Sequence, residues 1–208
     1  MLALYMQFDY DIMTPICKQT IHAQKGRFFM EKRSCVISGH NPQRFKFKYN
    51  EQAPLCKAIK AAIAEEVKTL YSNDVKLFYI GCAVGIDTWA AEIVLELRKQ
   101  TDYSDIELFC AMPFPGHAER YTAGQKRRYQ SILSQCTYKE VIGREYSPVS
   151  YKRLNYFMVD KSQYLIAVYD QNRSERSGLV QMVNYAVKKN LQITYIHPDT
   201  TEIARTAP

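Results

Sequence analysis

The segment from Lys76 to Leu97 places an apolar run, a glycine-containing turn and an amphipathic pattern in immediate succession. The run Leu77–Ile80 is short and continuous, which is typical of a strand buried on both faces of a parallel sheet. Gly81 and Gly85 allow the backbone to turn without a Cβ penalty. The helix that follows has its N-terminus behind this turn, where an anion is readily bound. The segment therefore predicts a strand, turn and helix that could hold a ligand.

The glycine spacing of this turn has two interpretations. The pattern G-x-x-x-G lacks both the full dinucleotide fingerprint and the Lys-Ser/Thr of a P-loop. It is therefore either a ligand-facing loop or a tight structural turn. Asp87 stands in the first helical turn, where a carboxylate favours the helix dipole but would repel a phosphate. A ribose hydroxyl is the expected partner of Asp87.

Strand and helix patterns alternate along most of the chain. The expected strands are 35–38, 77–80, 106–112, 138–142, 165–169 and 193–196, and the expected helices are 51–70, 86–97, 120–136, 151–161 and 177–189. Parallel neighbours need crossover helices, and right-handed crossovers place helices on both faces of the sheet. The pattern predicts an α/β fold, a Rossmann-like doubly wound and mostly parallel sheet with helices on both faces.

The chain divides into three expected segments. Residues 1–29 show no sustained periodicity, so we interpret them as a flexible extension or an over-called start. Residues 30–198 form the expected functional domain, and residues 199–208 a polar tail. N-terminal sequencing of the native protein would test the first boundary.

Composition limits the classes of function only loosely. With 208 residues, 47% hydrophobic content and 24% charged residues, the chain is ordinary for one globular domain. A net charge of +7 permits an acidic partner but does not require one. The six cysteines include no C-x-x-C pair, which argues against a zinc ribbon or redox motif and favours a reducing cytoplasm. No run approaches the ~20 apolar residues of a membrane span, so no membrane partner is expected.

Ligands of doubly wound sheets bind outside the carboxyl ends of the strands. That rule selects the loops at residues 39–41, 81–87, 113–117, 143–147 and 170–178. The chemistry of these loops decides the functional interpretation.

These loops carry a set of motifs that occur in order between Ser34 and Pro198. They are Ser38-Gly39-His40-x-Pro42 with Tyr49-Asn50-Glu51, Gly81-x3-Gly85-x-Asp87-x-Trp89-Ala90-Ala91-Glu92, Pro113-Phe114, Asn155-x-Phe157-Met158-Val159-Asp160-x-Ser162, and Val168-Tyr169-Asp170 before Ser177-Gly178. The chain thereby resembles the YspA/YoqJ-like branch of the SLOG superfamily, which also includes the Lonely Guy cytokinin-activating enzymes and the DprA/Smf proteins. The most specific part is Gly-x-Asp-x-Trp-Ala-Ala-Glu.

The resemblance implies a Rossmann-like domain that binds a nucleotide or a nucleotide-derived small molecule, in a branch mostly without an assigned function. It also implies a homo-oligomer. The residues that it puts at or near the pocket are Gly39, His40, Gly81, Gly85, Asp87, Trp89, Glu92, Asn155, Asp160, Asp170 and Gly178. The same loops add Cys82, Pro113 and Phe114 as ligand-binding candidates.

Two positions depart from the pattern of the superfamily. Asn41 stands where the branch often has arginine, which removes one cation from a phosphate site. The run Ser177–Gln181 stands where Lonely Guy proteins would have Gly-Gly-x-Gly-Thr and a following catalytic glutamate. Phosphoribohydrolase activity by that mechanism is therefore not expected.

Four candidate side chains have competing interpretations. His40 could donate to a phosphate or act as a general acid, or it could cap a loop. Cys82 could be a nucleophile only with a base such as His40 or His117 beside it, so we expect a buried spacer. Trp89 is expected to pack under the loop rather than to stack on a base. Glu92 has either a solvated or capping role or a catalytic one.

Three carboxylate and amide candidates follow in the second half of the chain. Asn155 and Asp160 are five residues apart, about 140° round an expected helix, so they cannot both contact one small group. One of them could face the pocket while Asp160 caps or fixes a neighbouring loop. Asp170 directly follows an apolar strand, where a carboxylate can bind a ribose diol or hold a turn, and we favour the ribose.

The segment Arg44–Tyr49 alternates cations with aromatic residues. If it is extended, its aromatic side chains share one face and could stack on single-stranded nucleic acid. The commoner outcome for such a pattern is an amphipathic loop that packs on the core. The triplet Lys126–Arg128 is expected to be a solvated helix face.

Three functions are compatible with these residues. The first is a cytoplasmic sensor or binder of a nucleotide-derived small molecule. The second is a hydrolase of an N-glycosidic or phosphate bond, with Glu92 or Asp87 as acid or base and His40 orienting the phosphate. The third is a DprA-like binder of single-stranded DNA. No metal site or cofactor is evident, although magnesium could accompany a phosphate ligand.

Overall fold

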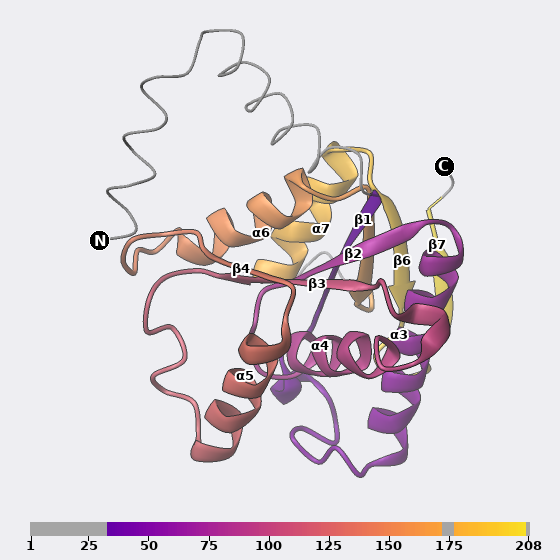
Figure 1. Cartoon of the computed structure of the whole chain (residues 1–208), viewed down its shortest axis with the longest axis horizontal. Coiled ribbons are helices and arrows are strands. Elements are labelled where there is room, and N and C mark those ends of the chain that lie inside the picture. The colour runs from indigo at the N-terminus through magenta and orange to yellow at the C-terminus, as the bar shows by residue number, and fades with distance from the viewer. Residues whose placement is uncertain (1–32, 172–176, 207–208) are drawn as a thin grey trace, which may run out of the picture. The chain divides into compact units, whose positions relative to one another are not determined.

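The computed structural model describes residues 33–171 and 177–206 (Figure 1). The extension expected at residues 1–29 lies outside them. The elements in chain order are β1 (Arg33–Gly39), η1 (Pro42–Arg44), α3 (Pro54–Ser72), β2 (Val75–Ile80), α4 (Ile86–Leu97), η2 (Thr101–Tyr103), β3 (Glu107–Met112), α5 (Ala123–Gln135), β4 (Tyr138–Val141), α6 (Ser150–Asp160), β5 (Tyr164–Val168), α7 (Gly178–Lys188), β6 (Gln192–Ile196) and β7 (Ile203–Arg205). Each strand and helix predicted between residues 35 and 196 is present, with ends that differ by a few residues.

Within the described residues, seven strands form one sheet in the order β4-β3-β2-β1-β5-β6-β7. β1 pairs in parallel with both β2 and β5, so that Cys35 lies opposite Phe78 on one side and Tyr164 on the other. The other pairs are also parallel except β6 with β7, which is antiparallel. The chain extends the sheet from β1 through β4 in one direction and from β5 onward in the other. The topological switch point, where open α/β sheets bind ligands, therefore lies between β1 and β5.

Helices cover both faces of the sheet (Figure 1). α3, α4 and α5 pack on one face, where Ile63 is fully buried, and α6 and α7 pack on the other, where Met158 is buried. The neighbouring β1 residues Cys35 and Val36 belong to opposite core clusters. Apolar side chains on both faces of one strand are what a buried parallel strand requires. The predicted doubly wound α/β fold is confirmed.

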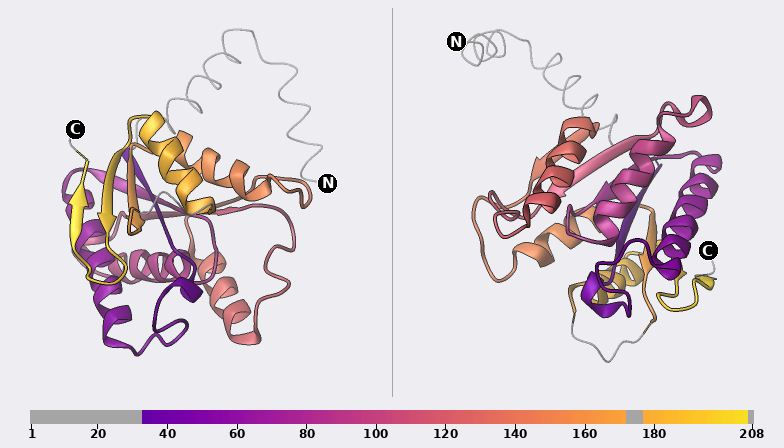
Figure 2. Two further views of the ribbon diagram at one scale, coloured as in Figure 1. Left: turned by 180° about the vertical axis from the view of Figure 1, so that it is seen from behind. Right: turned by 90° about the horizontal axis from the view of Figure 1, so that it is seen from below.

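The sheet ends in a strand that the sequence did not predict. β7 lies beside β6, with Arg205 opposite Thr194, at the edge drawn in yellow (Figure 2, left). The backbone N–H of Ile193 also donates to Oγ1 of Thr206 at 2.9 Å. All three β7 residues are exposed, so the segment has no apolar alternation that separates it from a tail. Part of the expected polar tail is thus an edge strand.

α3 is the longest described helix, with 19 residues. It carries polar residues such as Glu65 and Lys68 between its buried apolar residues, as expected of an amphipathic helix on a sheet. None of the helices within residues 33–171 and 177–206 is long and apolar enough to cross a bilayer.

Candidate ligand-binding site

The loops after β1 and β5 meet at the carboxyl edge of the sheet. Gly39 pairs with Val168, and the backbone N–H of His40 donates to the Val168 carbonyl at 3.1 Å. A Cβ on Gly39 would lie 2.7 Å from Cγ1 of Ile86 and 2.8 Å from Cβ of Val168, so only glycine fits without displacement. This close approach brings the first turn of α4 against the carboxyl ends of the neighbouring strands β1 and β5.

Three side chains converge where β1 and β5 end. Nε2 of His40 lies 3.4 Å from Oδ1 of Asp170, and Nη2 of Arg44 lies 2.5 Å from Oδ2 of Asp170. His40 is buried and the Asp170 side chain is 10% exposed, whereas 35% of the Arg44 side chain is exposed. We refer to these residues as the His40–Arg44–Asp170 cluster. The structure thus brings the predicted site residues His40 and Asp170 together at the switch point.

Arg44 is a member of this cluster that was not among the predicted site residues. The sequence placed it in an alternating basic and aromatic segment, whereas the structure makes it the last residue of η1. Asn41, where the resemblance expects an arginine, uses its Oδ1 to accept from the backbone N–H of Gln43 at 3.0 Å. Arg44 therefore supplies a cation near the position where the pattern lacks one. The sequence could have indicated Arg44 as a site residue, because it lies only five positions after the end of β1 at Gly39.

Asp87 is turned back into its own loop. Its Oδ2 accepts from the backbone N–H of Ala83 at 3.1 Å, and the residue is 8% exposed. Burial raises the pKa of Asp87 to about 6, and hydrogen bonds from the Ala83 and Gly81 backbones only partly oppose the rise. A Cβ on Gly81 would lie 2.9 Å from this same oxygen. Asp87 therefore organises the β2–α4 loop, and its role as a ribose ligand stays a prediction.

The second glycine of the turn makes room for the β1 loop. Gly85 has φ 100°, and a Cβ there would lie 2.5 Å from Cγ of Pro42. Cys82, in the same loop, has φ 59° and is buried in the core. Its carbonyl accepts from the Tyr121 hydroxyl at 3.1 Å. The packing of Gly85 on Pro42 supports the interpretation of this loop as a structural turn, and Cys82 lies buried as the sequence suggested.

The aromatic residues of the β1–α3 connection pack on Trp89. Phe45 and Phe47 stack with ring centroids 4.9 Å apart, and each lies within about 6.3 Å of the Trp89 ring. Phe45 is 1% exposed and Trp89 is 2% exposed. Lys60 places its Nζ 5.2 Å from the centroid of the indole ring. The segment is an amphipathic loop on the core, the outcome that the sequence favoured, and the burial of Phe45 leaves that ring unable to stack on a base.

Glu92 lies away from the strand ends in an ion pair with Arg128. Nε and Nη2 of Arg128 lie 2.7 and 2.6 Å from the two Glu92 carboxylate oxygens. Arg128 also contacts Glu51 at 2.5 Å, and Lys60 lies 2.5 Å from the same carboxylate. Burial opposes ionisation of Glu51, but Arg128 and Lys60 outweigh it and lower the pKa of Glu51 to about 2. Arg128 is thus part of an ion network between helices rather than a purely solvated side chain.

The residues predicted on α6 serve two different places. Nδ2 of Asn155 donates to the Gly178 carbonyl at 3.2 Å and ties α6 to the start of α7. Asp160 accepts from the Tyr185 hydroxyl at 3.0 Å and pairs with Lys189 at 2.6 Å. The structure therefore brings Asn155 and Gly178 together and leaves Asp160 in the packing of α6 on α7.

Pro113 and Phe114 begin the loop that follows β3. The backbone N–H of Gly143 donates to the Pro113 carbonyl at 3.0 Å, so this loop lies against the one after β4. Phe114 makes edge contacts with Tyr146 and Tyr151 at centroid distances of 5.3 and 6.0 Å. Tyr146 is 65% exposed and Tyr151 is 50% exposed. These three rings form an exposed aromatic patch at the carboxyl edge.

A pocket of about 440 Å³ opens beside the ends of β5 and β6. It is lined by Tyr169, Gln171, Tyr195, His197, Glu202, Ile203 and Ala204. Nδ1 of His197 accepts from the backbone N–H groups of Asp199 and Thr200 at 3.2 and 3.3 Å, so the neutral ring carries its proton on Nε2. The sequence missed this pocket because three of its seven lining residues come from the segment interpreted as a tail.

The five cysteines within the described ranges are free thiols, and all but Cys136 are buried. Burial raises the pKa of Cys136 to about 11 and that of Cys35 further. Within residues 33–171 and 177–206, no group of three His, Cys, Asp or Glu side chains is placed to hold a metal ion.

Comparison with known proteins gives consistent matches. The model of the YspA SLOG family matches residues 35–201. A UPF0398 protein of Staphylococcus epidermidis is 32% identical over 146 residues, which cover 68% of this chain and 77% of that protein. A UPF0398 protein of Bacillus cereus is 30% identical over 164 residues, which cover 78% of this chain and 86% of that protein.

A solved structure shares the fold. DNA processing protein A from Helicobacter pylori, described for its single-stranded DNA binding mode, aligns with a TM-score of 0.53. The alignment covers 81% of this chain and 67% of that chain at 16% identity. At this identity the similarity shows the arrangement of strands and helices alone.

Proposed function

Because this chain belongs to the YspA SLOG family, we propose that it binds a nucleotide or a nucleotide-derived small molecule, as a sensor or binding protein. The observation that carries the proposal is the His40–Arg44–Asp170 cluster at the carboxyl ends of β1 and β5. Open α/β sheets bind ligands at this point because the loops diverge there and leave a crevice.

The phosphate of such a ligand fits the Arg44 side of the cluster. A guanidinium presents several N–H donors in a plane, which matches the oxygens of a phosphate. Arg44 is partly exposed and can turn from Asp170 toward an incoming anion. His40 adds a second nitrogen beside it, and the N-terminus of α7, which begins at Gly178, adds the positive end of a helix dipole.

The ribose and base fit the Asp170 side. Asp170 offers carboxylate oxygens to a ribose diol, and the pocket of about 440 Å³ lies next to it. Tyr169 and Tyr195 give this pocket amphipathic aromatic walls, which suit a base. His197 adds a donor at Nε2, which supports recognition of an acceptor atom on the ligand.

A binding role is better supported than hydrolysis. A general acid or base must lie within hydrogen-bond reach of the reacting group. Glu92 is held by Arg128 on the helix layer, and Asp87 accepts from its own loop. The carboxylates expected to catalyse hydrolysis are thus engaged in other contacts. The His40–Arg44–Asp170 cluster instead offers charged groups that can bind a charged ligand.

The test is thermal unfolding and calorimetry of the full chain against ADP-ribose, NAD, nucleoside monophosphates and cyclic nucleotides. A ligand at a hundred times its Kd adds about 2.7 kcal/mol, which raises the midpoint by roughly 5 °C or more. We expect Arg44→Gln and Asp170→Asn to weaken binding at least tenfold. Asp105→Asn is the matched control, because Asp105 also pairs with a cation, Lys76, but is exposed and remote from the carboxyl ends of β1 and β5. Absence of any shift, or full affinity in Asp170→Asn, contradicts the proposal.

A second function, binding of single-stranded DNA, is favoured by the exposed aromatic patch. Tyr146 and Tyr151 flank Phe114 with their rings open to solvent. Residues 116–153 carry eight lysines and arginines against three glutamates. Aromatic rings among cations are the usual platform for stacked bases and their phosphates. The shared fold with DNA processing protein A, described as a single-stranded DNA binder, supports testing this function.

The second function is tested by the anisotropy of a labelled oligothymidylate at several salt concentrations. We expect affinity that falls with salt, because phosphate contacts release counterions. Tyr146→Ser and Tyr151→Ser should each weaken binding several-fold. Tyr49→Ser is the matched control, since Tyr49 is 52% exposed but belongs to the β1–α3 connection. An equal loss in the control would reject the patch as the binding surface.

A further inference from the structure

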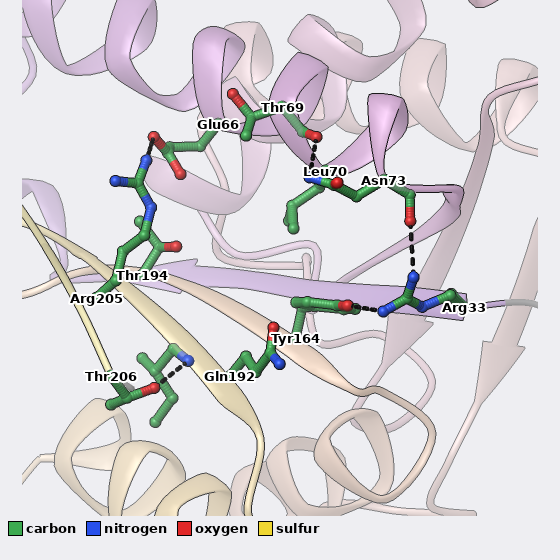
Figure 3. Close-up of a pocket in the computed structure, with 11 residues that line it drawn as sticks. Arg33, Glu66, Thr69, Leu70, Asn73, Tyr164, Gln192, Thr194, Arg205 and Thr206 are labelled. Carbon is green, nitrogen blue, oxygen red and sulfur yellow. Dashed lines mark hydrogen bonds and ion pairs between the residues drawn. The ribbon is translucent and has the colours of Figure 1, made fainter. Parts of the chain in front are cut away.

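A separate pocket of about 310 Å³ lies at the amino edge of the sheet, opposite the loops described above. It is walled by the C-terminal half of α3 and by the strands β1, β5, β6 and β7 (Figure 3). Glu66 and Leu70 of α3 line it from the helix, and Arg33, Tyr164 and Arg205 line it from the strands. Its volume is at the small end for ligand sites, which run from about 300 to 1,000 Å³. It therefore suits a molecule smaller than a dinucleotide.

Glu66 places a carboxylate on the buried stripe of α3. It lies among Ile59, Ile63 and Leu70 on this helix face and is only 3% exposed. A buried carboxylate is strongly unfavourable unless it is paired. Nη2 of Arg205 lies 2.5 Å from Oε1 of Glu66. Oε2 accepts no hydrogen bond from the described residues, and Figure 3 shows it directed toward the strands that wall the pocket.

Arg205 presents a complementary set of donors. It projects from β7, its side chain is 56% exposed, and only Nη2 contacts Glu66. Within the described part of the chain its Nε and Nη1 make no hydrogen bond. The ion pair thus exposes a carboxylate oxygen and guanidinium N–H groups side by side. A pure anion would meet Glu66 there, and a pure cation would meet Arg205.

The opposite wall is fixed and partly apolar. Nη1 of Arg33 donates to the Asn73 carbonyl at 3.0 Å, and Nη2 contacts the Tyr164 hydroxyl (Figure 3). These contacts hold the guanidinium of Arg33 5.3 Å from the centroid of the Tyr164 ring. The Leu70 side chain adds an apolar surface between the two arginines.

We propose that this pocket binds a small zwitterion with neighbouring ammonium and carboxylate groups, which is the chemistry of a free α-amino acid. The ammonium group donates to Oε2 of Glu66, and the carboxylate accepts from the open N–H groups of Arg205. The side chain of the ligand then lies against Leu70 and the Tyr164 ring. The proposal concerns a site apart from the nucleotide proposal and does not depend on it.

The test is calorimetry and thermal unfolding of the full chain with each standard free L-amino acid alone. We expect at least one to bind and, at about a hundred times its Kd, to raise the unfolding midpoint by roughly 5 °C or more. Its N-acetyl derivative lacks the ammonium group and its methyl ester lacks the carboxylate, so neither should bind. Equal binding of either derivative overturns the proposal, as does the absence of any shift.

Variants distinguish ligand binding from a purely structural role of the Glu66–Arg205 ion pair, which joins α3 to β7. Glu66→Gln should weaken amino-acid binding at least tenfold. Glu65→Gln is the matched control, because Glu65 is the exposed neighbour on the same helix and pairs with Lys68. If Glu66→Gln does not fold, the same loss of amino-acid affinity is tested in Arg205→Gln, because Arg205 lies on the exposed edge strand. If both pocket variants have lower unfolding midpoints but unchanged affinity for the amino acid, the ion pair has only a structural role and the site is rejected.

Discussion

Arg44 and Asp170 are 126 residues apart in the sequence and form an ion pair of 2.5 Å at the carboxyl edge of the sheet. Arg44 ends η1 after β1, and Asp170 follows β5. Since β1 and β5 begin the two halves of the doubly wound sheet, this pair joins the halves where their loops diverge. An incoming phosphate would compete with Asp170 for the guanidinium, so the pair is a contact that ligand binding is expected to rearrange.

The first prediction concerns the stability of this pair without ligand. Arg44→Gln should lower the free energy of unfolding by about 1–2 kcal/mol, because the Asp170 carboxylate, whose side chain is only 10% exposed, loses a cation. Asp170→Asn in the same chain should restore part of that loss. Urea unfolding of the two single variants and the double variant gives the coupling energy. Strict additivity of the three values would show that the pair contributes nothing to the fold.

The second prediction concerns the close approach at Gly39. A methyl group there would meet Ile86 and Val168 at less than 3 Å, so Gly39→Ala should destabilise the protein by roughly 1–3 kcal/mol. Gly124→Ala is the matched control. Gly124 lies in α5, and a Cβ there would find only Nη2 of Arg127, at 3.9 Å, so alanine should stabilise by about 0.5–1 kcal/mol. Denaturant midpoints of the two variants should move in opposite directions.

The layout of the fold was accessible from the sequence because it depends on local periodicity. The apolar run of β2 and the amphipathic pattern of α4 each occupy one continuous segment, and their alternation fixes a parallel sheet. β7 was not accessible, because its three exposed residues carry no such pattern. The loops at the carboxyl edge followed from the topology alone, and they include both His40 and Asp170.

The directions of the side chains were less accessible, since they depend on partners distant in the sequence. Nothing near Glu92 indicates that Arg128, 36 residues away, holds it outside the strand ends. Asp87 could have pointed outward from its helical turn, yet it caps the Ala83 amide. Pro42 explains Gly85 better than a phosphate does, because the contact between two loops is what requires the missing Cβ.

The third prediction concerns the pH dependence that Asp87 gives to folding. Its pKa is about 6 in the folded protein, above the ordinary value of 3.8. The folded state therefore binds the proton more tightly, and stability falls as the pH rises from about 4 to 6. The loss from this one group amounts to at most about 3 kcal/mol. Asp87→Asn should remove this slope, which chemical denaturation at a series of pH values would show.

The control for this measurement is Asp105→Asn. Asp105 is an exposed carboxylate that pairs with Lys76, and this cation together with the Tyr71 hydroxyl lowers its pKa. Its removal should leave the decline between pH 4 and 6 in place. If Asp87→Asn keeps the decline as well, another group is responsible, and the buried carboxylate does not titrate as described.

The last prediction concerns Glu51, which should act in the opposite sense. Arg128 and Lys60 hold the pKa of Glu51 at about 2 in the folded protein, below its ordinary value of 4.5, against the effect of burial. Its contribution is present above pH 4.5 and is lost as the pH falls toward 2. Because its side chain is 27% exposed, solvent screening reduces this contribution to about 1–2 kcal/mol. Glu51→Gln should therefore destabilise the protein at neutral pH and make little difference near pH 2. A constant difference between the two proteins across that range would mean that Glu51 acts through packing rather than through its charge.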